Sequence, residues 1–165
     1  MIITICADAS YDQDIKRASY GYTLYKDGRL EKGRGLFRGS VTDNNEAEVK
    51  ALQKAIAMAI EMYDLDSRDS ILAFSDSTHA IGVLTGSNQI LPHRCADAVA
   101  KRRLDAAIRR SGVTINIGHV KAHQTKCTDD LAYFNTLCDY AARTVLLDYR
   151  QAMRDRAEKA AASAA

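Results

Sequence analysis

The 165-residue sequence lacks the features of an exported or membrane-spanning protein. The N-terminal stretch MIITICADAS has neither the basic start nor the apolar length of a signal peptide. No segment approaches the roughly 18 consecutive apolar residues that a membrane span requires. Internal repeats and a linker-like change of composition are also missing. We therefore expect one cytoplasmic domain over residues 1–156, monomeric and without a membrane partner, followed by a frayed tail over residues 157–165.

Closely spaced cysteine pairs are missing as well, although the chain contains four cysteines. Without a CxxC motif or an export signal, these cysteines are expected to be reduced thiols. His123, Cys127 and Cys138 could contribute to a zinc site, but the set lacks a second close pair and a clear fourth ligand. The sequence thus favours idle or buried cysteines over a zinc site.

A strong excess of charge of either sign is absent too, since the formal net charge is only +2. This value neither requires nor excludes nucleic acid as a partner, so the distribution of charge along the chain must decide. Apolar residues make up 47% of the chain and charged residues 27%, the ordinary balance of a globular domain that buries a core.

Alternating hydrophobicity predicts three strands in the first part of the chain. Residues 2–9 and 18–25 are rich in β-branched and aromatic side chains, and a third strand ends near Arg38. Lys26-Asp27-Gly28 is a suitable hairpin turn between the second and third of these strands. We expect these three strands to pair as hairpins.

The remainder of the chain alternates between helical and strand patterns. The expected order is a helix over 44–62 capped by residue 42, 43 or 44, a buried strand over 70–74, a helix after Asp76, a long helix after Pro92, a strand over 113–120, and a last helix from near Asn135. This order predicts an α/β fold with a mixed sheet flanked by helices.

Two aspartates follow apolar strand segments. Asp8 comes after IITICA and Asp76 after ILAFS. If the two strands pair side by side, both carboxylates reach one edge of the core, where an ionised group must be paired, solvated or bound to metal. Either aspartate taken alone could be an ordinary strand-end or helix-cap residue.

The helix over 44–62 contains two glutamates that point to nearly opposite sides, because an α-helix turns by about 100° per residue. Glu46 shares its side with Lys50, which predicts a solvated stripe with an i,i+4 ion pair. Glu48 lies on the apolar stripe and is therefore directed toward the core edge where Asp8 and Asp76 are expected.

Asp139 is a fourth acid with apolar neighbours, here in the last helix. Clustered carboxylates repel one another unless a cation compensates, and oxygen ligands favour magnesium or manganese over softer metals. Two such ions about 4 Å apart can activate water and stabilise the leaving oxygen in phosphodiester cleavage. The acids therefore predict a metal-dependent hydrolase.

These residues, in this order, resemble type 1 ribonuclease H. The resemblance spans Ile2 to about Val145 and rests on the segments DAS (8–10), TDNNEAE (42–48), SDS (75–77), VKAH (120–123) and NTLCDYAAR (135–143). It implies a five-stranded mixed sheet with flanking helices. It also implies two-magnesium hydrolysis of the RNA strand of an RNA·DNA hybrid, leaving 5′-phosphate and 3′-hydroxyl ends, with Mn²⁺ as a possible substitute.

The resemblance assigns roles residue by residue. It implies that the metals are held by Asp8, Glu48, Asp76 and Asp139. His123 resembles the loop histidine that assists proton transfer or product release, although a loop histidine is usually only solvated. The residues implied to contact the hybrid are Ser10, Thr42, Asn44, Asn45 and Asn135. Helix capping is the competing explanation at residues 42–45, and positioning of the active-site loop is the alternative for Asn135.

Two departures from the family pattern concern this assignment. Ala9 replaces the glycine usual after the first aspartate, and the stretch between His123 and Asn135 is longer than in common bacterial members. A basic helix segment lies where some members grip the hybrid, with Lys101, Arg102, Arg103 and Arg109 as expected phosphate contacts. A solvated helix face is the alternative for that segment.

Two other functions compete with hybrid cleavage. Another nuclease of the same superfamily, such as a resolvase, transposase or exonuclease, would share the clustered acids and two metals. A catalytically inactive nucleic-acid-binding domain would have lost some of the acids, whereas all four and the histidine are present here. The NN pair and the late VKAH segment favour ribonuclease H.

Overall fold

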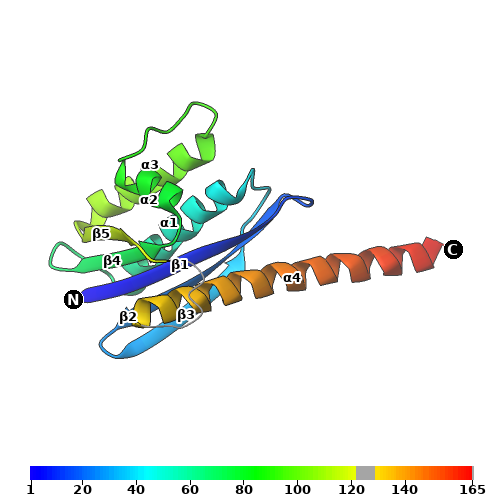
Figure 1. Cartoon of the computed structure of the whole chain (residues 1–165), viewed down its shortest axis with the longest axis horizontal. Coiled ribbons are helices and arrows are strands. Elements are labelled where there is room, and N and C mark those ends of the chain that lie inside the picture. Colours follow the sequence, from blue (N-terminus) through cyan, green and yellow to red (C-terminus); the bar gives the residue numbers. More distant parts are fainter. Residues whose placement is uncertain (122–128, 165) are drawn as a thin grey trace.

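The chain folds into one five-stranded sheet with helices on both faces (Figure 1). The computed structural model describes residues 1–121 and 129–164. Its strands lie in the order β3-β2-β1-β4-β5, with bounds β1 (Ile2–Asp12), β2 (Arg17–Lys26), β3 (Arg29–Leu36), β4 (Ser70–Ser75) and β5 (Thr114–His119). The helices are α1 (Asn44–Met62), α2 (Thr78–Thr85), α3 (Cys95–Ser111) and α4 (Asp130–Ala164). The predicted α/β class with a mixed sheet is confirmed.

The first three strands form an antiparallel meander, as the hairpin pattern predicted. Asp27 and Gly28 connect β2 to β3 with φ angles of 48° and 78°. Two consecutive residues in the left-handed region match the twist of a two-residue hairpin, which explains the Asp-Gly sequence at this turn.

The other half of the sheet is parallel. β1 pairs with β4, and β4 pairs with β5. The register places Cys6 opposite Phe74. Asp8 and Asp76 each come two residues later, so they lie at the same level along neighbouring parallel chains. This register is what brings residues 68 positions apart in sequence to one edge of the sheet.

The core has a separate apolar layer on each face of the sheet. On one face, α1 packs against the sheet and is itself contacted by α2 and α3, burying side chains such as Ile5, Leu52 and Leu104. On the other face, α4 covers β1 and β2 and buries Cys6, Phe134 and Cys138. None of the described helices is long and apolar enough to span a bilayer.

Gly21 on β2 allows α4 to approach the sheet closely. A Cβ atom at this position would collide with the carbonyl oxygen of Cys138. Two residues earlier, the Ser19 hydroxyl donates a 2.6 Å hydrogen bond to the Ala142 carbonyl oxygen. Because Gly21 pairs with Asp8 in the sheet, this close contact holds the part of α4 that contains Asp139 over the level of Asp8.

The bounds of α4 differ from the prediction at its start. The helix begins at Asp130, five residues before the predicted Asn135, and the Asp129 carboxylate accepts a hydrogen bond from the Ala132 amide. At the other end it continues past the sheet to Ala164 (Figure 1), and every side chain from Gln151 to Ala164 is exposed. Alanine-rich sequence favours helix even without packing, so the structure keeps residues 157–164 helical, and fraying of this tail in solution stays a prediction.

Candidate active site

Three acids from three different elements meet at one end of the sheet. Asp8 lies on β1, Glu48 on α1, and Asp76 directly follows β4. One carboxylate oxygen from each lies within 4.8 Å of the other two. Asp8 and Glu48 are buried, and Asp76 is half-buried. The convergence predicted from the strand and helix patterns is confirmed, and we call these three residues the acid cluster.

Burial and mutual repulsion disfavour the ionised forms of Asp8 and Glu48 in the acid cluster. Burial, followed by the charge of Asp76, raises the pKa of Asp8 to about 7. Burial, followed by the charges of Asp8 and Asp76, raises the pKa of Glu48 to about 10. The buried Oε2 atom of Glu48 has no hydrogen-bond partner among the described residues. Oxygen ligands with unmet charge and an unused lone pair fit a divalent cation such as Mg²⁺.

The acid cluster opens into a cavity of about 520 Å³, a size that accommodates part of a substrate as well as ions. Ser10, Asn44 and Asn45, three of the predicted substrate contacts, also line this catalytic cavity. Asp43 is the N-cap of α1, and its carboxylate accepts the Glu46 amide hydrogen. Capping therefore does not require the side chains of Asn44 and Asn45, so the competing explanation is wrong for these two.

Asp139 lies in the same cavity but outside the group of three converging oxygens. Its Oδ1 atom is 2.7 Å from Nε of Arg143, one helical turn later. The fourth predicted metal ligand thus has a cationic partner of its own, and binding a metal would require Asp139 to exchange Arg143 for the ion. Arg143 was not predicted as part of the site, although its i,i+4 spacing from Asp139 could have indicated it.

Glu46 corrects one expectation. It forms the predicted ion pair with Lys50, but it is buried rather than solvated. The second carboxylate oxygen accepts a hydrogen bond from the Thr42 amide at 3.0 Å. The loop before α1 folds over this carboxylate, so Glu46 and Glu48 are both buried, but only Glu48 points toward Asp8 and Asp76.

Two further predicted contacts do not line the catalytic cavity. The Thr42 carbonyl oxygen accepts a hydrogen bond from the Tyr11 hydroxyl, and its amide is used by Glu46. Asn135 is buried in α4, and its Oδ1 atom has no partner among the described residues. Direct hybrid contact by either residue stays a prediction.

The basic segment of α3 has the amphipathic arrangement that its sequence predicted. Leu104 is buried, whereas Arg102, Arg103 and Arg109 are exposed and free to meet a phosphate backbone. Lys101 forms an ion pair with Asp105. None of these four basic residues lines the catalytic cavity. Their predicted grip on the hybrid is therefore untested by this geometry.

The predicted histidine of the site, His123, lies outside the described residues, as does Cys127. Cys6 and Cys138 are free and buried, and Cys95 is free and exposed. Burial raises the pKa of the Cys6 thiol to about 12, so this thiol stays protonated at neutral pH. These cysteines behave as the small core residues or surface residues that the sequence favoured.

The structure places a different histidine in the catalytic cavity. His79 lies in the first turn of α2, three residues after Asp76, and its ring forms part of the cavity wall. Its Nε2 atom is 2.9 Å from Oδ2 of Asp97, whose side chain is 1% exposed. His79 was not predicted, because its partner comes from α3, 18 residues later, and no local pattern links the two.

Comparison with known proteins agrees with the fold. The family model described as RNase H matches residues 2–146. RNase H1 from the archaeon Halobacterium salinarum NRC-1 is 22% identical with a TM-score of 0.69, covering 90% of this chain and 99% of its own. The N-terminal RNase H domain of Rv2228c from Mycobacterium tuberculosis is 17% identical with a TM-score of 0.70, covering 92% and 98% respectively.

A third similar structure is LC11-RNase H1 in complex with an RNA/DNA hybrid. It is 16% identical to this chain with a TM-score of 0.62, and the alignment covers 87% of this chain and 99% of that protein. No curated protein sequence matches the chain. At these identities the solved structures establish the fold, and the family match over most of the chain establishes the family.

Proposed function

The chain belongs to the RNase H family, and we propose that it is an endonuclease that hydrolyses the RNA strand of RNA·DNA hybrids with two divalent metal ions. The products would carry 5′-phosphate and 3′-hydroxyl ends. The convergence of Asp8, Glu48 and Asp76 within 4.8 Å of one another carries this proposal. Family membership makes the chain a ribonuclease H-type hydrolase, whereas the metal, the substrate and the products are our proposal.

The acid cluster fits the metal. Its donors are all oxygens, the set that Mg²⁺ prefers, and Mn²⁺ shares this preference. Asp8, Glu48 and Asp76 would hold one ion, and Asp139, released from Arg143, would complete the site for a second. When bound, such ions supply an activated water and stabilise the leaving oxygen. The raised pKa values of Asp8 and Glu48 mean that an ion must displace protons as it binds.

The residues around the acid cluster would position the substrate. Ser10, Asn44 and Asn45 offer hydroxyl and amide groups to sugar and phosphate oxygens within the cavity. A relative with the same fold was solved in complex with an RNA/DNA hybrid, which supports the same class of ligand for this chain. The exposed arginines of α3 are proposed to contact the backbone outside the cavity. His123 as a proton-transfer residue, the monomeric state and the cytoplasmic location stay predictions.

Cleavage of end-labelled nucleic acids tests this function. The full chain would be incubated in Mg²⁺ with an RNA·DNA hybrid, double-stranded RNA, duplex DNA and a four-way junction of matched sequence. We expect cleavage of the RNA strand of the hybrid alone, loss of cleavage in EDTA, and 5′-phosphate ends. Cleavage of the junction or of DNA would instead favour another nuclease of the superfamily. Tight hybrid binding without any cleavage in Mg²⁺ or Mn²⁺ would favour an inactive binding domain.

A further inference from the structure

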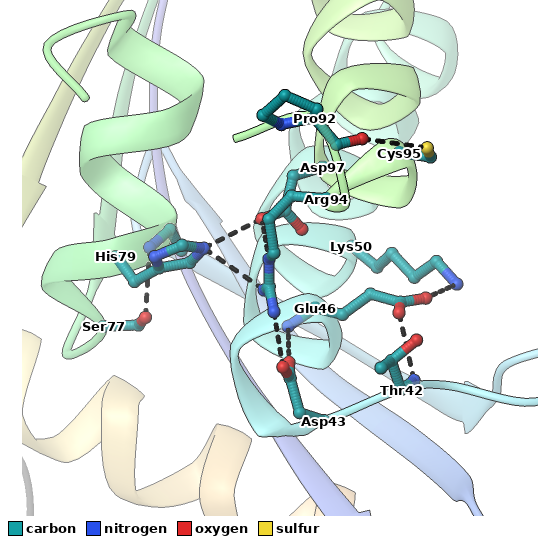
Figure 2. A network of polar contacts seen from close by, with 11 residues as sticks. Thr42, Asp43, Glu46, Lys50, Ser77, His79, Pro92, Arg94, Cys95 and Asp97 are labelled. Carbon is teal, nitrogen blue, oxygen red and sulfur yellow. Dashed lines mark hydrogen bonds and ion pairs between the residues drawn. The ribbon is translucent and has the colours of Figure 1, made fainter. Parts of the chain in front are cut away.

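A network of charged side chains joins the N-termini of α1, α2 and α3 (Figure 2). Arg94, directly before α3, forms an ion pair with Asp43, the N-cap of α1, and its Nε atom lies 2.9 Å from Oδ2 of Asp97. The same oxygen of Asp97 is 2.9 Å from Nε2 of His79 on α2. We call these four residues the Arg94 network.

The cost of burying Asp97 needs an explanation. Its carboxylate is almost completely buried, and a buried charge lowers stability unless its partners compensate. Both of its partners contact Oδ2, while the buried Oδ1 atom has no hydrogen-bond partner among the described residues. Arg94 already connects α3 to α1 through Asp43 without any help from Asp97. The additional contact that Asp97 provides is the one to His79.

This contact fixes the orientation and tautomer of His79. Nε2 of His79 is 2.9 Å from Oδ2 of Asp97 and 3.4 Å from Nη2 of Arg94. Because the nearer partner is a carboxylate oxygen, which accepts, we assign the proton to Nε2. The other ring nitrogen, Nδ1, forms no hydrogen bond within the described part of the chain. A carboxylate that orients one ring nitrogen leaves the other available to a ligand, an arrangement that recurs where histidine acts in binding or proton transfer.

The position of the ring indicates which ligand can reach it. His79 lines the catalytic cavity together with Asn45, and both residues also line an adjoining cavity with Ser87, Asn88, Arg94 and Asp97. His79 and Asn45 thus form the wall that the two cavities share. A strand held at the acid cluster that continued into the adjoining cavity would have to pass this wall.

We propose that His79 contacts the substrate, its Nδ1 atom binding an oxygen of the sugar-phosphate backbone where the strand leaves the catalytic cavity. Asp97 and Arg94 are the positioning residues that hold the ring in place. This inference rests on the proposed function, because it takes the bound molecule to be a nucleic acid. A 2′-hydroxyl can donate to Nδ1 of the neutral ring, whereas a phosphate oxygen, which only accepts, could be bound only by a doubly protonated ring.

Amide substitutions separate the two ring nitrogens. In His79→Gln the side-chain amide can reach the Nε2 position and keep the Asp97 contact, while the group at the Nδ1 position is lost. In His79→Asn the amide reaches the Nδ1 position but not Asp97. We expect His79→Gln to raise the KM for hybrid by roughly five- to thirtyfold, the effect of one lost hydrogen bond, with kcat changed less than about threefold. His79→Asn should have a smaller effect on KM.

A double variant tests whether Asp97 acts by orienting His79 or only by stabilising the fold. Asp97→Asn should raise KM in the same direction, and the double variant with His79→Gln should be no worse than His79→Gln alone, because both act through one contact. His119→Gln is the matched control: His119 is exposed at the end of β5 and does not line either cavity, so its KM should remain within about twofold of the wild type. If Asp97→Asn fails to fold, the two His79 variants still decide the question.

Modified hybrids identify the contacted oxygen. Single methylphosphonate or 2′-deoxy substitutions are introduced along the strand, and binding is measured in Ca²⁺ for the wild type and for His79→Gln. The substitution that weakens wild-type binding but has no further effect in His79→Gln marks the partner of Nδ1. Unchanged KM in His79→Gln, with an active wild type, would overturn this inference alone. A wild type that does not cleave hybrid would instead refute the proposed function.

Discussion

Two groups of acids, each with at least one buried carboxylate, lie at one end of this sheet, and they differ in how their charge is compensated. No lysine, arginine or histidine in the described part of the chain forms an ion pair with the acid cluster of Asp8, Glu48 and Asp76. The Arg94 network contains its own cations for Asp43 and Asp97. The carboxylates of the acid cluster therefore suit a bound cation, whereas those of the Arg94 network are already paired with Arg94.

The pKa values follow this difference. Burial and neighbouring carboxylates raise the pKa of Glu48 to about 10. Burial alone would also raise the pKa of Asp43, but the hydrogen bonds from Arg94 and the Glu46 amide hold it below its usual value. Asp97 is more buried than Asp8 or Glu48 and has Arg94 as its cation, so burial by itself does not mark a metal site. The useful signal is a buried carboxylate for which the chain supplies no cation.

The largest expected effect is on turnover when the acid cluster loses one charge. Asp76→Asn should lower kcat for hybrid cleavage by at least about a thousandfold, because the amide is a poor metal ligand. The fold should survive, and the melting temperature in EDTA should rise because one repulsive charge is gone. Steady-state cleavage assays and thermal unfolding in EDTA measure the two effects. Activity within tenfold of the wild type would remove Asp76 from the site.

Whereas removing a charge from the acid cluster should stabilise the fold, removing the cation of the Arg94 network should destabilise it. Arg94→Met should lower the free energy of unfolding by about 3 kcal/mol, because the buried Asp97 charge is left without its guanidinium partner. Urea denaturation followed by circular dichroism measures this value. A matched Arg102→Met variant removes an exposed arginine of the same helix and should change stability by less than about 0.5 kcal/mol. Equal stability of the two variants would contradict the contrast between network and cluster.

The acid cluster should determine whether the free energy of unfolding rises or falls with pH. Asp8 and Glu48 have raised pKa values in the folded state, so the folded state holds more protons than the unfolded state. Their contribution is complete below the unfolded pKa values of 3.8 and 4.5 and is lost as pH rises through about 7 and about 10. In EDTA the free energy of unfolding should therefore fall by several kcal/mol from about pH 5 to about pH 8.

Two comparisons sharpen this pH prediction. Glu48→Gln should flatten the decline, because it removes the group with the larger shift. Saturating Mg²⁺ should reverse it, since the ion binds the ionised carboxylates and its affinity rises with pH. A stability that increases with pH in EDTA would show that the acid cluster is compensated by a group other than a metal.

The sequence contained enough information to predict the acid cluster but not the Arg94 network. Asp8, Asp76 and Glu48 each interrupt a local apolar pattern, and local patterns report which side of a strand or helix is buried. The pairing of Asp97 with His79 depends on how α2 and α3 meet, which no periodicity encodes. The start of α4 was also misplaced, because the prediction did not use the capping side chain of Asp129, which accepts the Ala132 amide hydrogen.

The close packing of α4 at Gly21 and the burial of Glu46 were not predicted, for related reasons. Gly21 reads as an ordinary residue within a strand, and only the packing of α4 reveals that a side chain there would collide with Cys138. Glu46 was correctly paired with Lys50 but wrongly placed in solvent, because the loop carrying Thr42 folds back over it. Helical spacing predicts direction around a helix, whereas burial also depends on segments outside the helix.

The smallest expected effect comes from Glu46, which tests the contrast within a single helix. Glu46→Gln keeps the volume and can still accept the Thr42 amide hydrogen, while Lys50 is partly exposed and can turn toward water. The loss in the free energy of unfolding should therefore be about 1 kcal/mol or less, and kcat should remain within about twofold of the wild type.

Glu48→Gln, two residues away, is the matched variant and should behave in the opposite way on both measures. It should abolish turnover by removing a metal ligand, and it should stabilise the metal-free protein by removing a carboxylate that the chain does not compensate. Denaturation in EDTA and cleavage assays in Mg²⁺ on the two variants compare them directly. If Glu46→Gln were the inactive variant, the helix would present its other side to the substrate, and the acid cluster would not be the catalytic centre.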